Sequence, residues 1–258
     1  MCGRYVSASS PQEIVDYFGV ESLAEAVSDD SAPIEPNYNV APSVQVPTVS
    51  LHDNKRHLDR FRWGLIPSWA KSKTIGYKMI NARSETVKTK NAFRAAAKRR
   101  RCIIPADAFY EWTAVQHPTA KKPVKQPWCI QRTDSEPFAF AGLYEFWTDP
   151  ELDADDPAAK VVSCTVLTRE ANDAMSAIHD RMPVMLAPHR WDMWLDPSAE
   201  DIDALLGQVE VFPSELIEIY PVSRAVNNSR SRGVELLDHA EPVTTEMLAE
   251  ELAAKASS

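Results

Sequence analysis

Cysteine stands at position 2 of this 258-residue chain, directly after the initiator methionine. Removal of Met1 would leave a free α-amine and a thiol on adjacent carbon atoms. The α-amine has a reference pKa of about 7.7–8.0, so much of it is an unprotonated nucleophile near neutral pH. Such an amine can condense with an aldehyde to a Schiff base, and the thiol can then close a five-membered thiazolidine ring. The alternative is that Cys2 is an ordinary small, buried side chain.

Three further short segments combine functional side chains with residues that favour defined backbone conformations. They span residues 80–85, 109–112 and 178–183. Asn81 offers a neutral amide that can orient the amine without protonating it. Glu111 has aromatic neighbours in sequence that would raise its pKa and suit it to shuttle a proton. His179 can gain or lose a proton near neutral pH. Each also has a structural alternative: a turn cap, a polar strand position, or a histidine at a helix C-terminus.

The charge distribution suggests an anionic partner, although the chain carries a net charge of −9. Residues 55–101 hold 15 Lys and Arg against two acids, a balance of +13, whereas the rest of the chain has a balance of −22. This segregation predicts a cationic face that could concentrate a phosphate backbone. The alternative is a solvated basic helix at residues 91–101.

The remaining composition is that of an ordinary globular protein, 44% hydrophobic and 25% charged. Cys102, Cys129 and Cys164 lie in separate apolar runs, so neither a zinc site nor a disulfide framework is indicated and we expect no metal and no cofactor. The sequence shows no signal peptide and no apolar run long enough to span a membrane. We therefore expect a cytoplasmic protein, associated with the nucleoid when bound to DNA, and a monomer.

Local patterns predict a chain of short elements. Ser10-Pro11-Gln12-Glu13 is a capping box that should start a helix at residue 11. Helices are expected over residues 11–18, 91–101, 169–177, around the tryptophans at 191 and 194, and over 199–206 and 245–255. Strands are expected over residues 45–51, 56–63, 101–104, 107–112, 127–132, 137–146, 161–167, 183–186 and 216–222. Residues 21–48 are expected to be mainly loop, and residues 254–258 disordered.

These elements do not alternate strand and helix as a doubly wound fold does. The fold class they indicate is α+β, with a mostly antiparallel, barrel-like β core and peripheral helices. We expect a single domain over residues 1–240, followed by a C-terminal helix and tail over 241–258.

Several of these segments, taken in order, resemble the SRAP family, the SOS response-associated peptidases. The resemblance runs from Cys2 to about Leu237 and rests on residues 2–5, 38–43, 62–70, 80–85, 102–112, 140–145, 178–183 and 221–226. It implies the SRAP fold and a suicidal sensor of abasic sites in single-stranded DNA, in which the trimmed terminal cysteine bonds covalently to the ring-opened sugar. It also implies autoproteolytic removal of the first residue and lyase activity at abasic sites.

The same resemblance assigns the site. Its four active-site positions fall on Cys2, Asn81, Glu111 and His179. Its DNA contacts fall on Arg83 and Arg181 for phosphates, with Arg4, Asn39 and Pro42 near the same pocket and Trp69 or Trp63 as a platform for base stacking.

One departure concerns the loop where some members carry paired tryptophans, because this chain has Trp69-Ala70. Two other functions stay open. One is a cysteine peptidase or amidohydrolase that uses Cys2 as its nucleophile, and the other is a noncovalent reader of modified DNA bases.

Overall fold

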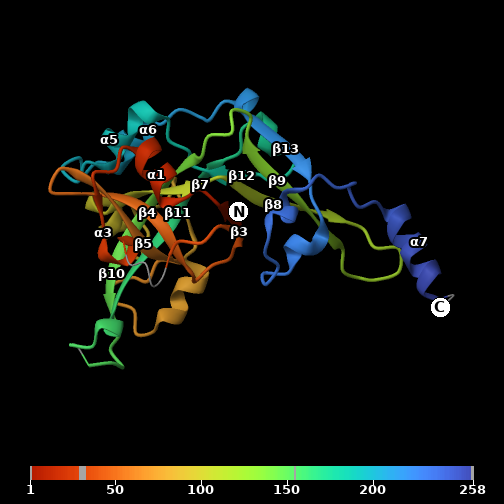
Figure 1. Ribbon diagram of the computed structural model, residues 1–258, viewed down its shortest axis with the longest axis horizontal. Helices are drawn as coiled ribbons and strands as arrows, with labels where there is room; N and C mark the ends of the chain where they lie inside the picture. The colour runs from red at the N-terminus through yellow and green to blue at the C-terminus, as the bar shows by residue number, and fades with distance from the viewer. Residues whose placement is uncertain (1, 29–32, 154, 257–258) are drawn as a thin grey trace.

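Five strands close into a barrel in the computed structural model, which describes residues 2–28, 33–153 and 155–256 (Figure 1). Their order around the barrel is β11 (Lys160–Glu170), β10 (Phe138–Thr148), β7 (Arg101–Ala106), β4 (Gln45–His52) and β5 (Lys55–Trp63). Neighbours pair antiparallel until β5 returns to β11 in parallel, with Ser163 opposite Arg62. Because the sheet closes on itself, each of these five strands pairs with a neighbour on both sides over at least part of its length.

Alternation along the barrel strands separates two cores. On β7, Cys102 and Ile104 point into the barrel, whereas Ile103 belongs to the core outside it. On β10, Phe140 points inward and Ala141 outward in the same way. Because successive residues of a strand point to opposite faces, one set of side chains fills the barrel and the other packs in the core outside it.

A second, antiparallel sheet carries the chain terminus. Its order is β13 (Ile217–Pro221), β9 (Val124–Arg132), β8 (Ala108–Val115), β1 (Tyr5–Ser7) and β3 (Asn37–Val40). Cys2 and Tyr5, at the start of this sheet, pack into the barrel-interior core beside Trp63. Cys2 and Tyr5 are thus placed where the two sheets meet.

Helices cover the outer face of the barrel. The α-helices are α1 (Pro11–Phe18), α2 (Glu25–Ser28), α3 (Arg94–Arg99), α4 (Asp173–Ser176), α5 (Trp191–Leu195), α6 (Ile202–Gly207) and α7 (Thr245–Ala256). Residues of α1, α3, α5 and α6 form most of the outer core with the outward-facing strand residues. By contrast, α7 lies at the edge of the molecule, away from the barrel (Figure 1).

Short strands and 3-10 turns complete the fold. The strands are β2 (Ser22–Leu23), β6 (Asn81–Arg83) and β12 (Arg181–Pro183). The turns are η1 (Lys73–Lys78), η2 (Pro157–Ala159), η3 (Pro188–Arg190), η4 (Ser214–Leu216), η5 (Arg224–Asn227) and η6 (Val234–Leu237). Both β6 and β12 pair with β11, so the segments holding Asn81 and Arg181 are fixed on the same strand.

The α+β class and the barrel-like core predicted from the sequence are confirmed. The predicted capping box starts α1, with the Ser10 hydroxyl accepting from the Glu13 amide and the Glu13 carboxylate accepting from the Ser10 amide. The strands expected over 45–51 and 56–63 also form, joined at Asp53 and Asn54, which both have positive φ.

Four local predictions are wrong. The helix expected over residues 169–177 shrinks to α4, because β11 continues to Glu170 to pair with β12 and the Asn172 side chain caps the helix later. The strand expected over 183–186 lies earlier, as β12. Residues 21–48 include β2, α2 and β3, whose strands depend on distant partners. Residues 254–256 belong to α7, whereas Ser257 and Ser258 lie outside the described residues.

The described residues include no helix long and apolar enough to cross a membrane. They also include no cluster of His, Cys, Asp and Glu that could hold a metal ion.

Candidate active site at the chain terminus

Strand β1 brings the start of the chain to Glu111. Tyr5 pairs with Phe109 of β8, and the Tyr110 amide donates a hydrogen bond to the Arg4 carbonyl at 3.0 Å. Because the pairing is antiparallel, the residues before Tyr5 run back towards Glu111. The Cys2 side chain is fully buried there. Met1 lies outside the described residues, so its removal stays a prediction.

Asn81 holds Cys2 directly. Its Nδ2 atom donates a hydrogen bond to the Cys2 carbonyl oxygen at 2.7 Å. Strand β6 fixes this side chain by pairing in parallel with β11, where Asn81 is opposite Val166. The Asn81 Oδ1 atom is buried and has no hydrogen-bond partner among the described residues. One end of the amide therefore anchors the terminal residue, and the other is a vacant acceptor suited to an amine N–H.

Glu111 and His179 line one pocket with Gly3. Trp112, Thr113, Ala114 and Lys125 complete its lining, and the space measures about 380 Å³. Glu111 is close enough to Cys2 for its charge to act on the thiol, and His179 is close enough to act on Glu111. The structure thus brings together all four predicted catalytic positions, Cys2, Asn81, Glu111 and His179.

Burial controls the protonation of the two central groups. Burial raises the pKa of the Cys2 thiol far above its usual range, and the negative charge of Glu111 raises it further. Burial also raises the pKa of Glu111, while the nearby His179 opposes that change. Both shifts follow from the cost of holding an anion away from water. The site therefore favours a neutral thiol and a carboxyl group that can carry a proton.

His179 is oriented by the chain that follows it. Its Nδ1 atom accepts a hydrogen bond from the Arg181 amide at 3.0 Å and lies 2.7 Å from Asp180 Oδ1. The amide requires a lone pair on Nδ1, so the neutral ring carries its proton on Nε2, whereas a protonated ring could donate to Asp180 instead. The Nδ1 atom therefore has a partner in either form of the ring.

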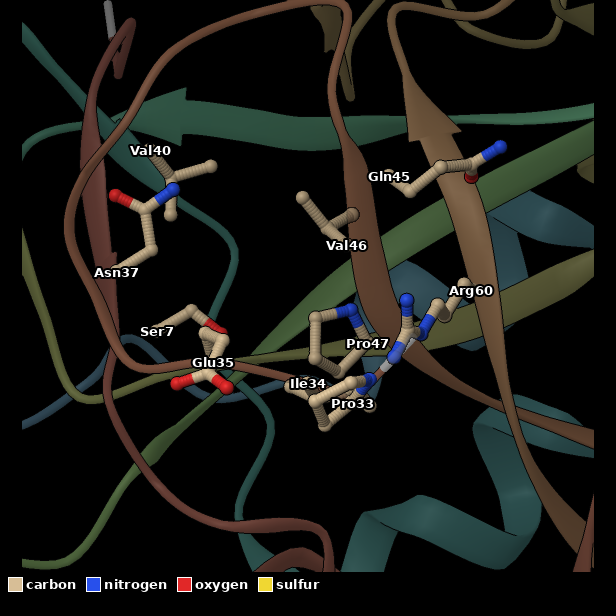
Figure 2. Close-up of a pocket in the computed structure, with 10 residues that line it drawn as sticks. All are labelled: Ser7, Pro33, Ile34, Glu35, Asn37, Val40, Gln45, Val46, Pro47 and Arg60. Atoms are coloured by element: carbon tan, nitrogen blue, oxygen red, sulfur yellow. The ribbon is translucent and has the colours of Figure 1, made fainter. Parts of the chain in front are cut away.

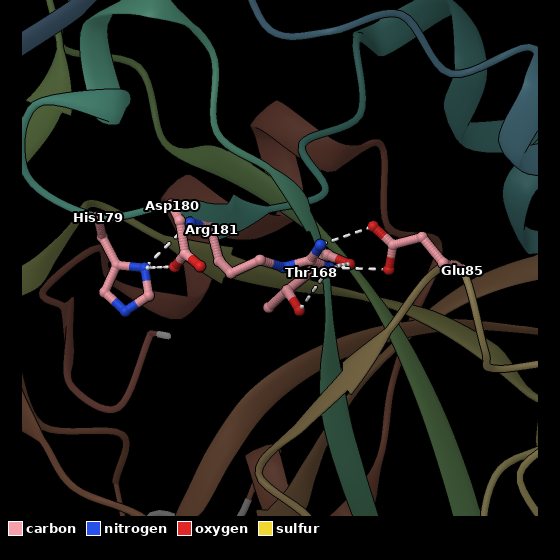
Figure 3. Close-up of polar contacts among 5 residues, drawn as sticks. All are labelled: Glu85, Thr168, His179, Asp180 and Arg181. Atoms are coloured by element: carbon pink, nitrogen blue, oxygen red, sulfur yellow. Dashed lines mark hydrogen bonds and ion pairs between the residues drawn. The ribbon is translucent and has the colours of Figure 1, made fainter.

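Arg181 points away from this pocket. Its guanidinium donates to both carboxylate oxygens of Glu85, at 2.6 and 2.9 Å, and to the Thr168 carbonyl at 2.7 Å. Figure 3 shows the His179 ring and the Arg181 side chain extending in opposite directions. A DNA phosphate that binds Arg181 would have to compete with Glu85 and Thr168 for the guanidinium. We therefore assign Arg181 a structural role as well.

The other predicted DNA contacts fall into two groups. Arg83 and Trp69 are exposed, Trp69 by 54%, so both are free to meet a ligand. Trp63 is fully buried and donates its Nε1 proton to the Ile80 carbonyl, which rules it out as a stacking platform. Ala70 is buried, and its carbonyl accepts from Trp147, so the small residue at this position serves packing.

Arg4 and Asn39 are hydrogen-bonded to each other, and Pro42 follows Asn39 three residues later in the chain. Arg4 donates to Asn39 Oδ1 at 2.6 Å and to the Val226 carbonyl at 3.1 Å. Asn39 is fully buried and donates to carbonyls of the segment after β13. Pro42 is partly exposed in the turn between β3 and β4. Arg4 and Asn39 thus join the chain terminus to residues 226–231.

The predicted cationic face is only partly present. Four of its basic residues pair with acids from elsewhere in the chain, in the pairs Arg56–Asp192, Lys88–Asp203, Arg99–Glu200 and Arg100–Glu145. Arg101 is buried and donates to backbone carbonyls. Counting charges along the sequence overestimated the cationic surface because it could not show these long-range partners.

Sequence reasoning missed Lys125 and Asn227, which belong to no motif that suggests chemistry, and it gave no role to Asp180, although Asp180 lies in the segment 178–183. A separate pocket, bordered by Ser7, Glu35, Val46 and Arg60, lies beside β3 and β4 (Figure 2). It contains a carboxylate and a guanidinium but neither a thiol nor an imidazole. The predicted catalytic side chains Glu111 and His179 line the pocket at Gly3 and not this one.

Comparison with known proteins shows the family of the chain. The family model of the SOS response associated peptidases (SRAP) matches residues 1–229. The chain belongs to the SRAP family. The abasic site processing protein YoqW of Bacillus subtilis (strain 168) is 39% identical over 238 residues, which cover 92% of this chain and 99% of that protein. The abasic site processing protein YedK of Escherichia coli (strain K12) is 30% identical over 242 residues, covering 92% and 99%.

A solved structure has the same fold. The crystal structure of a protein from Bacteroides thetaiotaomicron superimposes with a TM-score of 0.76 at 23% identity, covering 93% of this chain and 100% of that one. The helix α7 lies beyond residue 229, where the SRAP family match ends.

Proposed function

We propose that this SRAP protein senses and shields abasic sites in single-stranded DNA by bonding to them covalently through Cys2. After Met1 is removed, the α-amine attacks the aldehyde carbon of the ring-opened sugar, and loss of water gives an imine. The Cys2 sulfur then adds to the carbon of the protonated imine, the thiol proton passes to the Glu111 carboxylate, and a thiazolidine results. The names of the curated relatives support abasic DNA as the substrate.

The observation that carries this proposal is the hydrogen bond from Asn81 to the Cys2 carbonyl beside the pocket of Glu111 and His179. Asn81 fixes the terminal residue, and its vacant Oδ1 can accept from the amine. Glu111 can give a proton to the departing hydroxyl as the imine forms and take one from the thiol afterwards. His179 can exchange a proton with the sugar hydroxyl when the furanose opens.

The buried thiol weakens the peptidase alternative. A cysteine peptidase needs a thiolate, which is formed when the pKa of the thiol is lowered. Burial raises the pKa of Cys2 instead. We therefore restrict peptidase activity to removal of the protein's own first residue. Lyase activity at abasic sites follows from the same imine, which can lead to strand cleavage before the sulfur closes the ring.

We further propose that residues 1–240 form the functional domain and that a monomer acts on the DNA. Residues 241–258 are expected to be an appendage, because α7 lies apart from the barrel and follows the matched region.

Intact mass spectrometry with and without abasic single-stranded DNA tests the proposed function. The purified protein should begin at Cys2, and the adduct should weigh the sum of protein and DNA less one water. Cys2→Ala and a protein whose amine is acetylated should both lose the heat-stable adduct, whereas Cys129→Ser, a change at another buried thiol, should retain it. A stable adduct on protein that retains Met1 would refute the mechanism.

A further inference from the structure

Two pockets join into one groove along the chain terminus. The pocket of Glu111 and His179 also contains Gly3, Trp112 and Lys125. These same three residues line a second pocket, which continues to Arg4 and Asn227. Because three residues border both, the two pockets lie side by side, and we take them as one groove that leads from the reacting groups past Trp112 to a far end that the proposed chemistry leaves unused.

The far end is positively charged. Its lining contains Arg4 and Lys125 and no carboxylate. Arg232 stands near enough that its charge, after the larger effect of burial, lowers the pKa of Arg4. Cations held close together without an acid between them repel one another, and a bound anion relieves that repulsion. On a protein with a net charge of −9, such a place favours an anionic ligand.

The wall of this far end is prearranged. Asn227 accepts a hydrogen bond from Trp112 Nε1 at 2.7 Å and donates one to the Lys125 carbonyl at 3.1 Å. The indole is therefore fixed in the middle of the groove, and the Lys125 backbone is anchored while its side chain remains exposed. Arg232 is anchored similarly, because its guanidinium donates to the carbonyls of Ser229 and Ser231.

We propose that the far end binds the phosphate of a nucleotide next to the abasic residue, with Lys125 and Arg232 as the contacts. This inference deepens the proposed function and rests on it. A strand whose abasic sugar lies between Glu111 and His179 continues over Trp112, and its next phosphate meets the two cations. Contacts of this kind carry no base information, so the subsite positions any sequence equally.

Salt-dependent binding to DNA with an unreactive abasic analogue tests this subsite. The probe is an 11-nucleotide single strand with a central tetrahydrofuran residue, which has no aldehyde and so reports affinity alone. Lys125→Gln and Arg232→Gln should each reduce the slope of log Kd against log salt by about 0.7, and the double variant by about 1.4. Lys160→Gln, the same change at an exposed residue at the start of β11, should keep the wild-type slope.

Shortened probes locate the contact. Two further strands end at the abasic residue, one lacking its 5′ neighbours and the other its 3′ neighbours. With one of them, wild type and both variants should bind alike, because the phosphate in question is absent. Wild-type slopes in Lys125→Gln and Arg232→Gln on the full probe would overturn the inference. A failure of wild-type cross-linking to true abasic DNA would instead overturn the proposed function, because the slopes do not depend on that reaction.

Discussion

Arg181 and Arg83 should separate a structural arginine from a DNA-binding one, although the sequence assigned both to phosphates. In Arg181→Gln, the bidentate pair with Glu85 and the bond to the Thr168 carbonyl are lost. The Glu85 side chain is 47% exposed, so the pair is screened by water and contributes about 1 kcal/mol. The buried bond from a charged donor to Thr168 contributes about 1.5 kcal/mol.

The expected loss of unfolding free energy is therefore about 2–3 kcal/mol, or about 4–12 °C in Tm for a chain of this size. The loss should also depend on pH. The hydrogen bond from Arg181 lowers the pKa of Glu85, so the pair stabilises the fold above the usual glutamate pKa and is lost as pH falls through the lowered value. The difference between wild type and Arg181→Gln should accordingly shrink in acid.

Urea unfolding and salt-dependent DNA binding would be measured on the same preparations. Arg83→Gln is the matched control, because Arg83 is exposed at the end of β6. It should keep wild-type stability and reduce the salt slope by about 0.7. If Arg181→Gln left stability unchanged and reduced the salt slope instead, the structural assignment would be wrong and the prediction from sequence right.

Two further changes test the chemistry and the DNA contact. Glu111→Gln should slow cross-linking and strand cleavage by about 10²–10⁴-fold in single-turnover assays. Because burial raises the pKa of Glu111, its charge destabilises the fold at neutral pH and is neutralised as pH falls through the raised value. The Gln variant should therefore be the more stable protein at pH 8 and lose that advantage in acid; equal stability at both pH values would contradict this. Trp69→Ala should weaken binding of single-stranded DNA by about 1–3 kcal/mol, whereas Trp69→Phe should retain most of the affinity in fluorescence titrations.

Local signals in the sequence predicted local structure well. The capping box at Ser10 defines the start of α1, and Asp53-Asn54 forms the turn between β4 and β5 because both residues accept positive φ. Strands of two to four residues had no such signal. For example, β2 exists only because it pairs with β5, more than 30 residues away, and a local pattern cannot show that partner.

The candidate site was predicted from a different kind of signal. Cys2, Asn81, Glu111 and His179 stand out through family motifs, and the structure places the hydrogen-bonded pair Cys2 and Asn81 beside the pocket that Glu111 and His179 line. What the sequence could not show is which polar groups are already engaged. Arg181 pairs with Glu85, 96 residues earlier in the chain, and this pairing determines whether its guanidinium is free. The roles of charged residues depend on such distant partners more than on their neighbours.

In the proposed mechanism, the burial of Cys2 also sets the order of bond formation. A neutral thiol with a raised pKa is a poor nucleophile towards an aldehyde, so the amine, which is partly unprotonated near neutral pH, must react first. The protonated imine it forms is a stronger electrophile than the aldehyde and is held within reach of the sulfur, so the reaction becomes intramolecular. Sulfur addition then requires removal of the thiol proton, and Glu111 is the carboxylate whose charge already acts on that thiol. The same buried side chain can thus release a proton to form the imine and recover one to close the ring.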